Sequence, residues 1–176
     1  AASMFLNCSS LTDLDLSNFY TPQLESVSIK RGSGNGYYGM FENCSSLVNL
    51  DISSLNTDNI TILENMFRNC SSLISLDLSN FNTINVIDMG GMFYNCSSLI
   101  NLDLSNFYTP NLTSVTSINQ TGYGSVGMFE NCSLLENLNL SNFSIENVTS
   151  ITTLFSNCNN MKILDIRNFN FDLVEN

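Results

Sequence analysis

The six cysteines are the residues of this chain with the most obvious capacity for chemistry, and their spacing is regular. They lie at positions 8, 44, 70, 96, 132 and 158, so successive cysteines are 36, 26, 26, 36 and 26 residues apart. Cysteines can pair as disulfides or bind metal ions, but here none lies close to another in sequence and the chain has no histidine. We expect free thiols stacked in one buried column, a common role of unpaired cysteine. Disulfides between neighbouring repeats are the alternative.

Carboxylates recur with the same period and are the second chemical feature. Charges about 5 Å apart on stacked repeats would repel by about 0.8 kcal/mol in water and about 3 kcal/mol at an effective dielectric constant of 20. Divalent cations or a cationic partner would relieve this repulsion, but hydrogen bonds from neighbours such as Ser17 and Asn18 are the simpler explanation. The weak metal candidates are Asp15, Asp51, Asp77, Asp103 and Asp165, with Asn139 at the remaining equivalent position.

Nothing else in the sequence indicates catalysis. The lack of histidine removes the commonest general base. The chain has no nucleophile-elbow motif, and no carboxylate pair lies outside the repeat pattern. The glycine-rich segment GSGNG lacks the Lys-Ser/Thr end of a phosphate-binding loop. We therefore predict no catalytic residue, no cofactor-binding residue and no cofactor, in a protein that is not an enzyme.

The charge balance argues against nucleic acid as a partner. The 176 residues include 16 acidic and 5 basic side chains, for a net charge of −11, and binding to nucleic acid requires clustered Lys and Arg. Apolar residues make up 43% of the chain, but no run approaches the length of a membrane span. The first residues, AASMFLNCSS, have neither the basic start nor the apolar stretch of a signal peptide. We expect no membrane insertion in this segment.

The cysteines and aspartates belong to a phrase that the chain repeats six times. Residues 92–110 read MFYNCSSLINLDLSNFYTP, and residues 4–22 read MFLNCSSLTDLDLSNFYTP. A fixed period in this range indicates a solenoid. We predict one continuous solenoid of six coils over residues 1–176, organised as two super-repeats of 88 residues. Looser copies of the phrase begin at Met40, Met66, Met128 and Leu154.

Within each coil, the pattern L-x-x-L-x-L is typical of the strand of a leucine-rich repeat. Alternate side chains of a strand share one face, so Leu14 and Leu16 should point inward and Asp15 outward. The MFxNC segment is too short for a long helix, and we predict one helical turn or a piece of 3₁₀-helix with Phe and Cys inward. One coil buries too little surface to be stable alone, so it needs neighbours. The expected fold class is an α/β solenoid of leucine-rich-repeat coils with one short parallel β-strand per coil and little regular helix.

The pattern MFxNCSSLxxLDLSNFNT, repeated over the whole chain, resembles the BspA-like leucine-rich repeats. That family comprises 26-residue repeats of bacterial surface proteins, of mycoplasma-type lipoproteins and of some protist surface proteins. The resemblance implies a solenoid at the cell surface or outside the cell, with adhesive or binding roles and no catalysis. This sequence departs from the family in its insertions and in its last unit, LFSNCNNMKILDIRNFNF.

Two of the coils carry insertions, at residues 28–39 (SIKRGSGNGYYG) and 116–127 (TSINQTGYGSVG). The preceding segments, residues 4–27 and 92–115, share 19 of 24 residues, whereas the insertions share 3 of 12. We infer that the insertions are free of the constraint that stacking places on the coils. They should project from one side, three coils apart.

The insertions contain candidate contact residues. Tyrosine offers rigid, amphipathic contact area, and we predict that Tyr37, Tyr38 and Tyr123 contact neighbouring arrays or a ligand. Solvated surface loops are an equally good interpretation. Among the N-glycosylation sequons, Asn119 is the best acceptor because it alone lies in an insertion. The others occupy repeat positions, where an asparagine ladder between coils is the simpler expectation.

The two ends of the sequence match the repeat register. Residue 176 placed before residue 1 gives NFNFDLVENAASMF, which aligns with NFNTINVIDMGGMF at residues 80–93. We therefore predict one period of a longer array, either covalent or built from separate copies that stack head to tail along the solenoid axis. Contact between two different surfaces that does not close into a ring produces an open filament.

These features predict a non-catalytic structural or adhesive segment of a long extracellular or cell-surface array, with further copies of itself as partner. The alternative is a receptor-like or adhesin binding module that binds a host or matrix protein through its sheet face or its inserted loops. The first hypothesis requires end-to-end contact, whereas the second requires a discrete, capped end.

Overall fold

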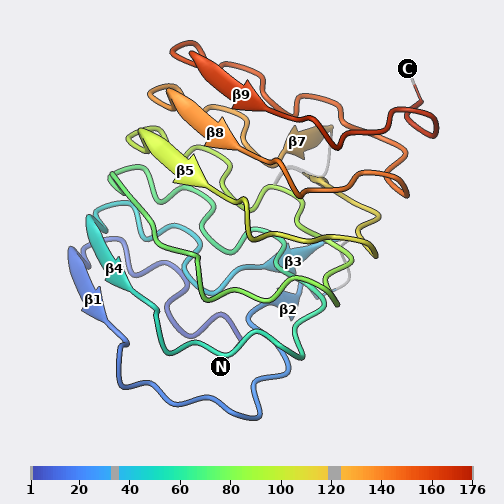
Figure 1. The fold of residues 1–176 in the computed structure, drawn as a ribbon. Helices are drawn as coiled ribbons and strands as arrows, with labels where there is room; N and C mark the ends of the chain where they lie inside the picture. The colour runs from blue at the N-terminus through green and yellow to red at the C-terminus, as the bar shows by residue number, and fades with distance from the viewer. Residues whose placement is uncertain (1, 33–35, 119–123, 176) are drawn as a thin grey trace.

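The computed structural model describes residues 2–32, 36–118 and 124–175. The chain winds into a stack of irregular coils (Figure 1), which we number one to six by their cysteines, from Cys8 to Cys158. One side of the stack carries short parallel strands, and two antiparallel hairpins leave it elsewhere. No helix occurs among the described residues, so the expected α/β label is corrected to a solenoid of strands and turns.

The parallel strands align equivalent residues of successive coils, and they form two separate sheets. The first sheet pairs β1 (Asp13–Asp15) with β4 (Asn49–Asp51). The second pairs β5 (Asn101–Asp103) with β8 (Asn137–Asn139), and β8 with β9 (Ile163–Asp165). The register joins Leu14 to Leu50, and it joins Leu102 to Leu138 and Leu138 to Leu164. The predicted ladder of strand leucines is therefore confirmed within each sheet.

The prediction of a strand in every coil is wrong for coil three, which separates the two sheets. Residues 74–78 form no strand, and no described backbone hydrogen bond joins residues 74–77 to residues 48–51. Side-chain amides reinforce the pairing of β1 with β4 and of β5 with β8, since Asn49 donates to Asp13 at 2.6 Å and Asn137 donates to Asn101 at 2.5 Å. Coil three has Ser75 at this position. The amide is a reinforcement and not a requirement, because β9 pairs with β8 although Ile163 stands at this position in coil six.

A continuous column of phenylalanines runs through the core. Ring centroids of neighbours lie 5.5–5.7 Å apart along the series Phe5, Phe41, Phe67, Phe93, Phe129 and Phe155. Offset stacking at this separation adds to the free energy gained from burying the rings. Phe81 and Phe107 stack in a second column at 6.3 Å. These columns support the interpretation of the chain as tandem repeats.

The MFxNC segments are successive tight turns rather than a piece of helix. The amide of Cys44 donates to the carbonyl of Phe41 at 3.1 Å, as in a 3₁₀ turn. The intervening asparagine, however, has a positive φ, for example 64° at Asn43 and 60° at Asn69. Asparagine adopts this left-handed conformation more readily than most residues do, and only as single residues. The helix therefore cannot propagate, although Phe and Cys point inward as expected.

These asparagines also connect the coils through their side chains. The amide of Asn43 donates to the side-chain oxygen of Asn7 at 2.7 Å, and that of Asn69 donates to Asn43 at 2.7 Å. The series continues from Asn95 to Asn69 at 3.1 Å. Four of the sequon asparagines are thus held by hydrogen bonds between coils.

All six cysteines are free thiols in one column. Each thiol from the second coil onward donates to a phenylalanine carbonyl of the preceding coil, for example Cys44 to Phe5 at 3.1 Å and Cys96 to Phe67 at 3.1 Å. Burial raises the pKa of Cys44 to about 11. Burial also raises the pKa of the four cysteines that follow, so the thiols from Cys44 to Cys158 are protonated and pack as small apolar groups.

Candidate functional site

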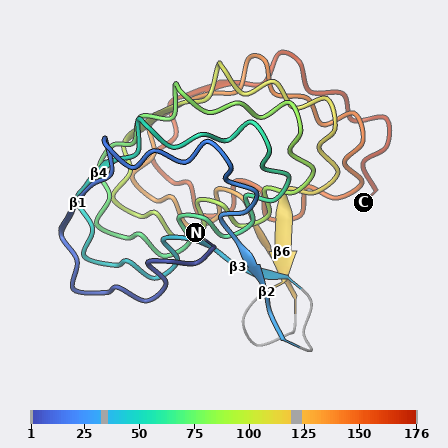
Figure 2. The same ribbon diagram turned by 90° about the horizontal axis from the view of Figure 1, so that it is seen from below.

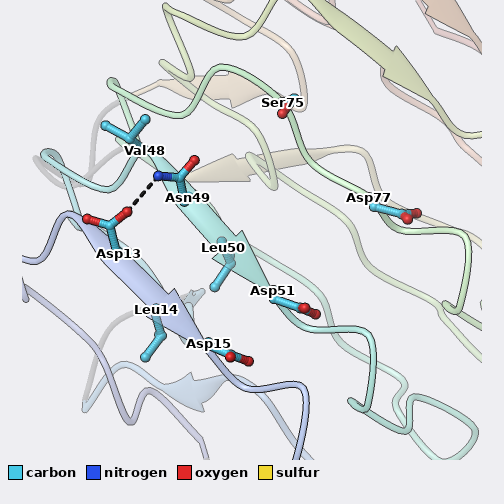
Figure 3. A pocket seen from close by; sticks show the side chains of 9 residues that line it. All are labelled: Asp13, Leu14, Asp15, Val48, Asn49, Leu50, Asp51, Ser75 and Asp77. Atoms are coloured by element: carbon cyan, nitrogen blue, oxygen red, sulfur yellow. Dashed lines mark hydrogen bonds between the residues drawn. The ribbon is translucent and has the colours of Figure 1, made fainter.

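The outer face of the strands forms a shallow, acidic hollow over the first three coils. Its lining includes Asp13 and Asp15 of β1, Asp51 of β4, and Ser75 and Asp77 of coil three, around a space of about 400 Å³. Figure 3 shows Asp15, Asp51 and Asp77 in one row on successive coils. The predicted acidic ladder thus lines one surface, and the hollow lies where the two sheets separate.

Each aspartate of the ladder accepts the backbone amide of the residue two positions later and so caps the turn that follows it. The backbone amide of Ser17 donates to Asp15 at 2.8 Å, and that of Ser79 donates to Asp77 at 2.9 Å. The pKa of Asp15 is lowered, chiefly by the Ser17 hydroxyl and then by the Ser17 amide. Repulsion between the carboxylates is therefore offset within each coil, by the following serine at Asp15, Asp51, Asp77 and Asp103. Arg167 has this role at Asp165, where its amide and its guanidinium both donate to the carboxylate.

The same role accounts for the one asparagine in the ladder. The side-chain oxygen of Asn139 accepts the backbone amide of Ser141 at 3.0 Å, as a carboxylate would. Asn18, the other expected donor, instead reaches the Ser17 hydroxyl at 3.5 Å. Among the described residues, no group of three or more Cys, Asp or Glu side chains is arranged to hold a metal ion.

The two insertions form hairpins that leave the solenoid together, on a side away from the parallel sheets (Figure 2). The first pairs β2 (Ile29–Lys30) with β3 (Tyr37–Tyr38), and the second pairs β6 (Thr116–Ile118) with β7 (Ser125–Gly127). The sequence places them three coils apart, yet the side chain of Asn65 bonds to both of them. The hairpins therefore stand side by side.

The predicted contact tyrosines differ in their surroundings. Tyr38 is 36% exposed, and the guanidinium of Arg31 lies 4.3 Å from its ring centroid. The carbonyl of Tyr37 accepts hydrogen bonds from Arg31 at 3.0 Å and Asn65 at 2.8 Å, so its backbone is part of the scaffold. Two further predicted residues, Tyr123 and Asn119, lie outside the described residues.

A buried charged cluster lies beneath the first hairpin. Arg31 forms an ion pair with the fully buried Glu42 at 3.0 Å, and Arg68 lies 3.9 Å from the same carboxylate. The guanidinium of Arg68 also lies 4.4 Å from the ring centroid of Tyr94. Burial lowers the pKa of Arg68, and the charge of Glu42 opposes this effect.

This cluster was not predicted from the sequence. A signal was nevertheless present. Glu42, Arg68 and Tyr94 all occupy the variable position of MFxNC in successive coils. Stacking therefore places a carboxylate, a guanidinium and an aromatic ring next to one another, which is a favourable sequence of partners.

The terminal coils of the described structure expose positions that are buried in the inner coils. Met4 is 51% exposed, whereas its equivalents Met40 and Met66 are fully buried. At the other end, Phe171 is 50% exposed, whereas Thr83 and Thr109, at the same repeat position of coils three and four, are 2% and 1% exposed. In Figure 1 the two termini lie toward opposite ends of the stack. None of the described residues forms a helix that is long and apolar enough to cross a membrane.

A family model described as "Mycoplasma protein of unknown function, DUF285" matches residues 1–125 and 123–176, and so accounts for the whole chain. No curated protein and no solved structure matches the chain.

Proposed function

Because the chain belongs to the DUF285 family of mycoplasma proteins, which is a BspA-like repeat family, we propose that it is a structural and adhesive segment of a long repeat array. In this proposal the array lies outside the cell or on its surface and performs no catalysis. The coils are leucine-rich repeats whose strand follows the L-x-x-L-x-L pattern. The partner of each segment is another set of coils of the same kind, stacked head to tail.

One observation carries this proposal: the core columns continue to both terminal coils. Met4 and Phe171 are about half exposed, although the residues at their repeat positions in coils two to five are fully or almost fully buried. Covering a large apolar side chain is worth about 1.5–3 kcal/mol. Additional coils, from the same polypeptide or from another copy, would cover these faces with the geometry that the inner coils already use.

Self-association of the chain tests the head-to-tail contact. We expect light scattering and electron micrographs to show short linear oligomers at high protein concentration. Met4→Glu and Phe171→Glu should each reduce their length, because a charge would be buried at the contact. Ile74→Glu is the matched control, since Ile74 is 49% exposed on an inner coil and should leave assembly unchanged. A wild-type chain that stays monomeric would contradict stacking between copies.

Location is tested separately on intact cells. We expect an antibody raised against the solenoid to label unpermeabilised cells, and external protease to remove that label. Labelling that appears only after permeabilisation would contradict a surface role, whatever the result of the assembly experiment.

The acidic hollow favours a second candidate, a binding module for a cationic host or matrix protein. Asp15, Asp51 and Asp77 present three carboxylates in a row on a chain of net charge −11. Binding of a basic peptide to immobilised protein should weaken with salt and be lost when these three aspartates become asparagine. Asn139 already supports the same turn with an amide, so the variant should fold. An unchanged affinity would exclude this face as the binding site.

A further inference from the structure

The two hairpins meet at one polar side chain although they are 88 residues apart in the sequence. The side-chain amide of Asn65 donates to the carbonyl of Tyr37 on β3 at 2.8 Å. The same amide nitrogen lies 3.1 Å from the hydroxyl of Ser117 on β6. Asn65 is fully buried and belongs to the connection between coils two and three. In Figure 2, β3 and β6 lie next to each other at the base of the projecting hairpins.

The neighbouring Glu64 adds a second link between the hairpins. Its side chain is 3% exposed, and its Oε1 accepts the hydroxyl of Ser117 at 2.5 Å and the amide of Asn65 at 3.2 Å. Gly36 of the first hairpin, with a φ of +94°, lies so close that a Cβ added there would be 2.9 Å from Glu64 Oε1. The carboxyl group is therefore enclosed by both hairpins.

The charges around Glu64 do not neutralise it. Arg31, next to β2, approaches it, but that guanidinium is paired with Glu42 at 3.0 Å. Arg68, from the turn of coil three, lies 3.9 Å from Glu42 and donates to the side-chain oxygen of Asn65 at 3.3 Å, and its charge also interacts with Glu64. Asp88, from the connection between coils three and four, is a further negative charge that faces it.

Burial is therefore the main influence on Glu64, and it raises the pKa of that carboxyl to about 7. Hydrogen bonds from Ser117 and Tyr37 and the charge of Arg31 oppose this shift, whereas Asp88 adds to it. The protonated carboxyl is neutral and fits the enclosed site, whereas the ionised form is a poorly compensated buried charge.

We propose that Glu64, Asn65 and Ser117 form a latch that couples the two hairpins into one unit, and that this latch tightens as the medium becomes mildly acidic. The linkage has a definite sign. Folding takes up a proton at Glu64 when the pH lies between 4.5, the ordinary pKa of glutamate, and about 7. The stabilisation is complete below pH 4.5 and is lost as the pH rises through about 7.

Hydrogen exchange of the hairpin amides, followed by mass spectrometry and corrected for the intrinsic rate, tests the coupling. Ser117→Ala should speed exchange in peptides that cover β2 and β3 as well as in those that cover β6 and β7. Ser125→Ala is the matched control, because Ser125 is exposed on β7 and its change should affect at most the second hairpin. An effect of Ser117→Ala that is confined to β6 and β7 would overturn the coupling.

The pH arm uses Glu64→Gln, which keeps the acceptor oxygen but has no charge. For the wild type, the corrected exchange rate of both hairpins should rise between pH 5 and pH 7, by up to about tenfold per pH unit. Glu64→Gln should keep exchange slow across this range, whereas Glu146→Gln, at an exposed position, should follow the wild type. If the exchange rate of Glu64→Gln rose with pH as it does in the wild type, the acid dependence would be overturned. The Glu64→Gln variant gives this answer even if Ser117→Ala destabilises the fold.

Discussion

The body of the solenoid and the base of the two hairpins are stabilised in opposite ways. In the body, each side chain meets its own equivalent in the next coil, as in the phenylalanine column and the asparagine ladder. At the base of the hairpins, unlike residues meet once, as when Asn65 bonds to both Tyr37 and Ser117. The comparison teaches that a repeated contact stabilises every coil a little, whereas a single polar contact concentrates its effect at one place.

The largest expected effect comes from opening a hole in the repeated core. Phe67→Ala removes a fully buried ring that stacks between Phe41 and Phe93. We expect the free energy of unfolding to fall by about 3–5 kcal/mol, measured by urea denaturation. Tyr20→Ala is the control, since Tyr20 is 83% exposed and should change stability little. Equal losses of unfolding free energy in the two variants would mean that the stacked phenylalanines stabilise the fold no more than an exposed side chain does.

The next effect concerns Asp88, which lies between the two regions. Burial raises its pKa to about 6 from an ordinary value of 3.8, against the hydrogen bonds from the Gly90 amide and Ser114. The wild type should therefore lose stability as the pH rises from 3.8 to about 6, by roughly 3 kcal/mol in total. In the wild type, Asp88 accepts a hydrogen bond from the Gly90 amide at 2.8 Å. Asp88→Asn keeps this acceptor oxygen but has no titrating carboxyl group.

Thermal unfolding from pH 3.5 to pH 8 measures that prediction. Asp88→Asn should flatten the part of the profile below about pH 6, while Glu64→Gln should flatten the part up to about pH 7. Asp15 has the opposite sign, because its lowered pKa gives stability that is lost only as the pH falls below its ordinary value of 3.8. An unchanged profile for Asp88→Asn would show that its carboxyl is not buried in solution.

A pair of substitutions at Asn69 separates backbone conformation from the side-chain ladder. Asn69 has a φ of 60°, donates to Asn43 and accepts from Asn95. Asn69→Gly keeps the conformation and should cost about 1 kcal/mol for the lost hydrogen bonds. Asn69→Ala adds a left-handed alanine and should cost about 1–2 kcal/mol more. Equal denaturation midpoints for the two variants would show that the positive φ is not under strain.

The smallest effect is a gain in stability at the break between the sheets. Ser75→Asn gives coil three the amide that reinforces the pairing of β1 with β4 and of β5 with β8. We expect an increase of about 1 kcal/mol in the free energy of unfolding, with slower hydrogen exchange in residues 74–78. Ser71→Asn, which lies in the same coil outside the strand position, is the control. A loss of stability in Ser75→Asn would show that this amide does not reinforce pairing in coil three.

The period of the sequence was sufficient to predict much of this molecule. The register of Leu14 with Leu50, the inward phenylalanines and the column of free cysteines all follow from one rule, that equivalent residues stack. The rule predicted a strand in coil three wrongly, since residues 74–78 form none although their leucine and aspartate match the other coils. It also predicted the aspartates as one row, and they line one face of the first three coils.

What the tertiary structure alone decided is the meeting of residues that are not equivalent. Glu64, Asn65 and Ser117 occupy different repeat positions. Ser117 lies 52 residues from Asn65 and 53 from Glu64 in the sequence, and these separations do not mark the three residues as neighbours. They meet because the hairpins leave the stack on one side and enclose the shorter connections between them. The repeat length determines contacts between like residues since stacking is local and periodic, whereas the path of an insertion depends on the whole surface against which it packs.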